Sequence, residues 1–139
     1  MNTPEELGAL VRATFVGETG EFRPCAVFDR ALDCIRVITA DTSVTEIRVN
    51  DLLTVLEDNY PNSNSRKYVG FTIKGARHFC QQRSFNLTIP IKLTELLDAI
   101  LASTPDPFVR VVIDGIARPL VEEKKIEPVS LSGPVPRAA

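Results

Sequence analysis

Five short apolar runs, each with a two-residue period and each bounded by turn-forming residues, constrain the fold of this chain most strongly. Such alternation places every second side chain on the same side of an extended strand, so each run predicts a strand with one face to be buried. In the last run, Val69, Phe71 and Ile73 share that face. Short connections favour antiparallel pairing. The predicted strands span about 22–28, 33–39, 44–49, 52–58 and 68–74.

Three segments have the spacing of an amphipathic helix. The first, at about 3–14, begins with Thr3-Pro4-Glu5-Glu6, which combines a capping residue, a proline suited to the first helical position and a capping-box glutamate. A short helix is predicted at about 76–83, and a longer one, capped by Thr94, at about 94–103. The chain is therefore predicted to be an α+β domain, in which an antiparallel β-meander sheet is packed by two to three helices.

Two further strands are predicted outside this meander. Residues 85–92 alternate apolar and polar side chains, and Pro90 lacks the N–H that a central strand needs, so the segment is predicted to be an edge strand. A last strand is predicted at about 108–113. From Pro119 onward the sequence is polar and rich in proline. We therefore predict one domain over residues 1–118 and a loose tail over residues 119–139.

Length and composition limit the class of protein. A chain of 139 residues with 44% hydrophobic residues is long enough for one core, and its apolar runs are much shorter than the ~20 residues that cross a bilayer. The first residues lack the basic and apolar regions of a secretory signal. Cys25, Cys34 and Cys80 are widely spaced within apolar stretches, which indicates buried free thiols in a reducing compartment. We therefore expect a cytoplasmic protein without membrane contact.

The stretch from Phe28 to Gly75 carries a series of short patterns in a fixed order. They are Phe28-Asp29, Asp33-Cys34-Ile35-Arg36-Val37, Val44-Thr45-Glu46, Leu53-Thr54-Val55-Leu56 and Val69-Gly70-Phe71-Thr72-Ile73. This series resembles a small bacterial β-rich domain family of unknown function. The resemblance spans about residues 28–75, a third of the chain, and implies a β-rich fold and a bacterial-type protein, with no function attached.

The sequence contains no motif for catalysis, a cofactor or a metal. His78 is the one histidine, and on a helix Cys80 lies about 200° around the axis from it, so the two side chains cannot share a metal ion. We predict no catalytic residue, no cofactor and no metal site. The competing class is a small-ligand enzyme, which would have to gather Asp29, Asp33 or Glu46 in a cleft.

An acid-free stretch is the most informative feature for function. Residues 59–94 contain no Asp or Glu and six Arg or Lys, whereas residues 1–58 contain 11 acidic and 5 basic side chains. This basic strip, within residues 66–92, predicts a surface that holds an acidic protein partner. The start of the 76–83 helix would be its centre, because free backbone N–H groups there attract anions. The residues expected to carry it are Arg66, Lys67, Lys74, Arg77 and Arg83.

Other roles for the basic strip stay open. It would also serve to neutralise the acidic N-terminal half, within the fold or across a homodimer. A small anion or a single-stranded nucleic acid is a further alternative, with Tyr60 and Tyr68 as stacking groups. A net charge of -2 and a pI of about 5.4 disfavour nucleic acid. The sequence therefore predicts a non-enzymatic binding module.

Overall fold

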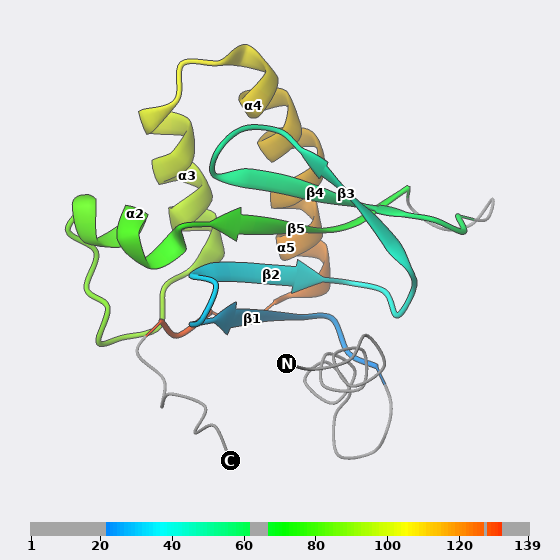
Figure 1. The fold of residues 1–139 in the computed structure, drawn as a ribbon, viewed down its shortest axis with the longest axis horizontal. Coiled ribbons are helices and arrows are strands. Elements are labelled where there is room, and N and C mark those ends of the chain that lie inside the picture. Colours follow the sequence, from blue (N-terminus) through cyan, green and yellow to red (C-terminus); the bar gives the residue numbers. More distant parts are fainter. Residues whose placement is uncertain (1–21, 62–66, 127, 132–139) are drawn as a thin grey trace.

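The five strands predicted between residues 22 and 74 form one antiparallel sheet (Figure 1). The structure is a computed structural model that describes residues 22–61, 67–126 and 128–131. The strands are β1 (Cys25–Asp29), β2 (Cys34–Ile38), β3 (Val44–Arg48), β4 (Leu53–Asp58) and β5 (Tyr68–Lys74). Together with the helices that follow, this sheet confirms the α+β class.

The order of the strands in the sheet is β1-β2-β5-β4-β3. The segment β3-β4-β5 is a meander, and the β1-β2 hairpin joins its last strand, so β5 lies in the centre. Gly70 in β5 allows the close approach to β2 there, because a Cβ atom at this position would lie 2.2 Å from the backbone oxygen of Val37.

The helices of the described residues follow the sheet in the sequence and lie on one of its faces (Figure 1). They are α2 (Ala76–Gln82), α3 (Leu93–Ser103), α4 (Pro107–Val112) and α5 (Arg118–Lys124), with α4 and α5 joined by one π-helical turn, η1 (Ile113–Ala117). Alternate residues of the central strands meet the helices in one core, as the two-residue period predicts. The strand residues of this core are Ile35, Val37, Leu53, Val55, Phe71 and Ile73.

The two predicted helices in the described part of the chain are confirmed, with one difference at a helix start. Helix α3 begins at Leu93, and its N-cap is Lys92, which makes no side-chain capping bond, so Thr94 is not the cap. The stripe of Leu93, Leu96, Leu97 and Ile100 is buried as expected. The helix predicted at residues 3–14 lies outside the described residues.

The predicted edge strand at residues 85–92 is wrong. The Asn86 side chain accepts hydrogen bonds from the backbone N–H of Thr88, at 3.0 Å, and from its hydroxyl, at 2.6 Å. This local turn competes with an extended conformation. The segment makes only an isolated bridge, between Ile91 and Val129. It does not join the sheet, whose edge strands are β1 and β3.

The predicted strand at residues 108–113 is also wrong, since these residues form α4 and the start of η1. Asp106 caps the helix by accepting a hydrogen bond from the N–H of Phe108 at 2.9 Å, and Pro107 occupies the first turn. Val109, Val112 and Ile113 are buried. Their spacing of three and four residues is the helical period, which here prevails over the strand preference of β-branched residues.

The domain boundary predicted at residue 119 is too early. Helix α5 buries Leu120 and Val121 in the core. Val129 and Leu131 are buried as well, at 4% and 1% exposure, and Val129 pairs with Ile91. The folded unit therefore extends through residue 131, and residues 132–139 of the predicted tail lie outside the described residues.

Candidate functional site

The start of α2, predicted as the centre of an anion-binding surface, already holds a carboxylate of the chain itself. Asp33 lies 2.7 Å from the backbone nitrogen of Arg77 and 3.3 Å from that of His78, and it accepts a hydrogen bond from each. The Arg77 guanidinium donates to the carbonyl oxygen of Leu131 at 2.7 Å. The expectation of a partner's acid at this position is therefore wrong, because Asp33 takes the donors that it would use.

The other residues of the predicted basic strip are spread over the molecule. Lys67 pairs with Glu57 at 3.7 Å, and Arg83 lies over the Phe79 ring. Lys67 precedes β5 and Lys74 ends it, so the two are roughly 20 Å apart along the strand. Arg66 lies outside the described residues. The structure does not bring these residues into one patch.

The carboxylates that an enzyme would have to gather are each engaged by a donor of the chain itself. Asp29 accepts a hydrogen bond from the N–H of Leu32 within the β1-β2 turn, Asp33 caps α2, and Glu46 pairs with Arg36. None of the three side chains lines either of two small hollows on the described surface. Because each carboxylate already has a partner and none lies in a hollow, the arrangement counts against the enzyme alternative.

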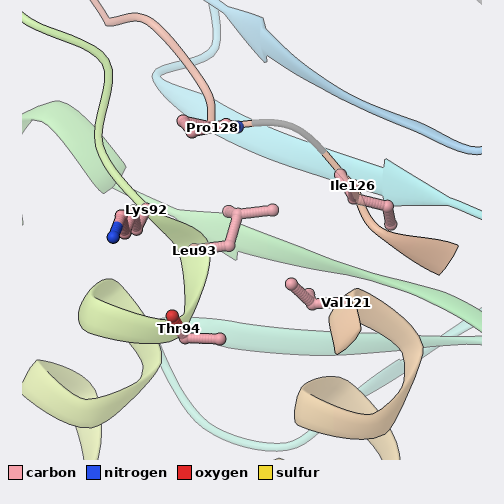
Figure 2. Close-up of a pocket in the computed structure, with 6 residues that line it drawn as sticks. All are labelled: Lys92, Leu93, Thr94, Val121, Ile126 and Pro128. Atoms are coloured by element: carbon pink, nitrogen blue, oxygen red, sulfur yellow. The ribbon is translucent and has the colours of Figure 1, made fainter. Parts of the chain in front are cut away.

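Two small hollows are found on the described surface, with volumes of about 250 and 200 Å³. The first lies between the start of α3 and the segment after α5 (Figure 2). Leu93, Val121, Ile126 and Pro128 line it with apolar atoms, and the Lys92 ammonium points away from them (Figure 2). The second is lined by Lys67, Tyr68, Gly115, Ile116 and Leu120. Neither hollow is lined by an aspartate, a glutamate, a histidine or a cysteine.

The thiols and the possible metal ligands also lack the features of a reactive site. Burial raises the pKa of the Cys25 and Cys34 thiols, and it raises that of Cys80 to about 11, so all three are protonated near neutral pH. Among the described residues, no three His, Cys, Asp or Glu side chains are grouped as a metal site would require.

The face of the sheet opposite the helices carries polar side chains on the same strands that build the core. The pairing register puts Arg36 beside Thr72 and Thr72 beside Thr54, on β2, β5 and β4, and continues to Arg48 on β3. These residues alternate with core residues, so they project from the other face. Lys74, two residues after Thr72, projects with them and is exposed. We call this row of side chains the open face.

An ion pair crosses the open face. Arg36 Nη1 lies 3.2 Å from Glu46 Oε1, and the two side chains are 33% and 52% exposed. Arg36 is on β2 and Glu46 on β3, so the pair spans β5 and β4, which lie between them. Thr54 and Thr72 project from the same face on these two strands and are only 1% and 5% exposed.

Three polar atoms in this row are buried without a hydrogen-bond partner among the described residues. They are Arg36 Nε, Thr54 Oγ1 and Thr72 Oγ1. An orphaned buried polar group costs about 1–3 kcal/mol, so native proteins contain few of them. Here three occur at directly adjacent positions of the sheet. Such a cluster makes this row of side chains the candidate functional site.

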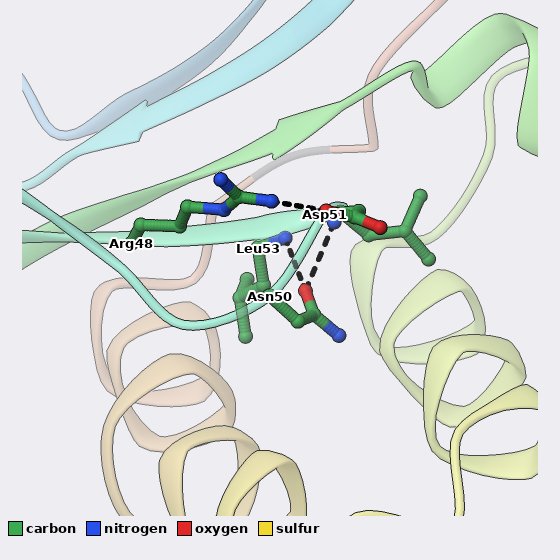
Figure 3. Close-up of polar contacts among 5 residues, drawn as sticks. Arg48, Asn50, Asp51 and Leu53 are labelled. Atoms are coloured by element: carbon green, nitrogen blue, oxygen red, sulfur yellow. Dashed lines mark hydrogen bonds and ion pairs between the residues drawn. The ribbon is translucent and has the colours of Figure 1, made fainter.

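The β3 end of the open face is held by a tight turn (Figure 3). Asn50 accepts hydrogen bonds from the N–H groups of Leu52 and Leu53 at 2.9 and 2.7 Å, and Arg48 pairs with Asp51. This last pair is highly exposed, so it contributes little to stability, and the Arg48 guanidinium can exchange Asp51 for another carboxylate at low cost.

Of the residues in this row, Lys74 is among those predicted from the sequence to carry the basic strip, whereas Arg36, Thr54 and Thr72 are not. A threonine within a strand is ordinary, and only the strand order shows that these two lie side by side at the centre of the sheet. The available signal was the polar residue at every second position of otherwise apolar runs.

Comparisons with known protein families, curated proteins and solved structures found no match. The resemblance over residues 28–75 therefore stays a prediction. None of the described helices is long and apolar enough to cross a membrane.

Proposed function

We propose that the protein is a non-enzymatic binding module that holds an acidic segment of a protein partner on the open face of its sheet. The observation that carries this proposal is the row of orphaned donors Arg36 Nε, Thr54 Oγ1 and Thr72 Oγ1. A guanidinium N–H and two hydroxyl groups are donors that suit a carboxylate.

The charges around this row support an anionic partner. Arg36, Arg48 and Lys74 project from the same face, and Lys74 is exposed at the end of β5. The negative groups nearby, Glu46 and Asp51, form surface ion pairs with two of these cations. Such pairs contribute about 0–1 kcal/mol each, so an acidic segment with several carboxylates would exchange with them at low cost.

We also propose a cellular location and an origin for the protein. The described cysteines are free thiols, half-buried or buried, which fits a reducing compartment, and we propose the cytoplasm. The resemblance over residues 28–75 supports a bacterial-type protein.

Binding of a fluorescent oligoglutamate peptide, measured by anisotropy, tests this proposal, with an oligolysine peptide as the probe of opposite charge. We expect the oligoglutamate peptide to bind and its affinity to fall as salt is added, because exposed charges are screened. An R48E/K74E double variant should lose most of the binding. A lack of binding by the unchanged protein at low salt would overturn the proposal.

The matched control is the K67E/R83E double variant, which has the same change in net charge. Both residues belong to the predicted basic strip, yet neither lies in the row of side chains that forms the open face. Its binding should fall much less than that of R48E/K74E. Equal losses in the two variants would show that total charge, and not the open face, attracts the peptide.

A further inference from the structure

We propose that Arg36, Thr54 and Thr72 form a carboxylate-binding site that Glu46 closes in the free protein. This inference rests on the proposed function and adds its chemical detail: the group that is bound, the atoms that bind it and the side chain that regulates access.

The atoms of the site are adjacent by the register of the sheet. Arg36 is the pairing partner of Thr72, and Thr72 is the pairing partner of Thr54. Directly paired residues have Cβ atoms about 4.5–5.5 Å apart, so one carboxylate can lie within reach of neighbouring side chains in this row. Thr54 and Thr72 are buried at 1% and 5% exposure, and their hydroxyl groups lack a partner among the described residues.

Of the three nitrogens of the Arg36 guanidinium, Nη1 binds Glu46 and Nε is left for a ligand. Nη1 donates to Glu46, whereas Nε is buried without a hydrogen-bond partner among the described residues. Arginine commonly binds a carboxylate through two nitrogens at once. The geometry of Arg36 therefore permits a second carboxylate, provided that it reaches the space between Nε and the threonine hydroxyls.

Glu46 controls that access. Its side chain comes from the edge strand β3 and meets Arg36 above β4 and β5. Because the pair spans the two strands that carry the buried hydroxyls, we infer that a ligand reaches them only after the pair opens. Glu46 is about half exposed, and a surface ion pair of this kind is weak. The negative charge of Glu46 also repels an incoming carboxylate, so it acts as a closure that a partner's acid displaces.

The decisive variant is Glu46→Gln, measured with the same oligoglutamate peptide. Loss of the surface ion pair should tighten peptide binding about two- to fivefold. Glu57→Gln is the control, because Glu57 is also paired with a cation, Lys67, and its substitution removes the same single charge. The inference is overturned if E46Q binds no more tightly than E57Q.

The hydroxyl groups are tested by Thr54→Val and Thr72→Val, which keep the side-chain shape. Each variant should bind the peptide about two- to tenfold more weakly, the effect of one lost hydrogen bond. Each should be as stable as the unchanged protein or more stable, because a methyl group replaces an unpaired buried hydroxyl. Unchanged affinity in both variants would show that these hydroxyls bind water only, and would overturn the site.

NMR titrations with the peptide and with acetate show whether the bound carboxylate belongs to a protein partner or to a small acid. The quantity measured is the change in the backbone amide shifts of Thr54 and Thr72. Shifts at these two residues with peptide and not with millimolar acetate indicate a protein partner, whereas equal shifts with acetate indicate a small acid. Either result supports the site, and shifts confined to other residues overturn it. If the unchanged protein fails to bind the peptide, the proposed function falls; if it binds while E46Q and the threonine variants behave like it, only this inference falls.

Discussion

Asp33 is the residue on which the start of α2 depends, and its replacement gives the sharpest stability prediction. Its carboxylate accepts hydrogen bonds from the backbone nitrogens of Arg77 and His78, 44 and 45 residues later in the chain. Its backbone has a φ of 49°, in the left-handed region, which aspartate, asparagine and glycine tolerate better than alanine. The side chain and the backbone thus make separate contributions.

Three substitutions at Asp33 separate these contributions. Asp33→Asn keeps the tolerance of positive φ and one acceptor oxygen for the Arg77 N–H, but it loses the charge and the acceptor for the His78 N–H, about 0.5–1.5 kcal/mol in total. Asp33→Gly loses the capping bonds without backbone strain, about 1–2 kcal/mol. Asp33→Ala loses the bonds and adds the left-handed cost of a residue with a Cβ atom, for a total of about 2–4 kcal/mol.

Urea denaturation followed by circular dichroism measures the free energy of unfolding for each variant. The expected order of stability is Asp, Asn, Gly, Ala. Asp51→Ala serves as the control, because Asp51 is 90% exposed and its ion pair should contribute less than about 0.5 kcal/mol. Equal stability of the glycine and alanine variants would refute the backbone argument, and an asparagine variant as unstable as the alanine variant would refute the argument from retained capping.

Three further predictions concern the packing, a turn and the pH dependence of the fold. Gly70→Ala should destabilise by more than about 2 kcal/mol, since its Cβ atom would meet the Val37 oxygen, whereas Gly115→Ala, with no atom within 4 Å, should stabilise by about 0.5–1 kcal/mol in thermal denaturation. Asn50→Ala removes two hydrogen bonds within the β3-β4 turn and should lower the free energy of unfolding, measured in urea, by about 1–2 kcal/mol. A decrease below about 0.3 kcal/mol, which is close to the measurement error, would contradict this prediction. Burial raises the pKa of the Cys80 thiol to about 11, so as the pH rises this thiol ionises first in the unfolded chain. The contribution of Cys80 to stability is therefore full below about pH 8 and is lost between about pH 9 and 11, by about 1.4 kcal/mol per unit of pKa difference. A C80A variant should lack this part of the decline, and parallel pH profiles of the two proteins would contradict the assignment to Cys80.

The strands could be predicted from the sequence because each has one buried face, and the two-residue period of Ile35 and Val37, or of Phe71 and Ile73, records that face directly. The period says nothing about which strands become neighbours. The central position of β5 depends on its pairing with β2, a contact between segments more than 30 residues apart, so the adjacency of Thr54 and Thr72 could not be predicted.

The two wrong strands have a common physical cause, which is that local capping decides between helix, turn and strand where the apolar pattern is short. Asp106 and Pro107 start a helix in a segment rich in valine, and Asn86 starts a turn in a segment that alternates. The sequence favoured an anion from a partner at the start of α2, but that position is taken by Asp33 of the same chain, which is 44 residues away in sequence and next to it only in the fold.

The central place of β5 has a consequence for how the protein is made. During synthesis the β1-β2 hairpin and the β3-β4 hairpin emerge first, and each can pair internally. Both β2 and β4 keep an unpaired edge until residues 68–74 leave the ribosome and bond to both of them. A nascent chain that stalls before Tyr68 therefore exposes two open strand edges, which are templates for aggregation.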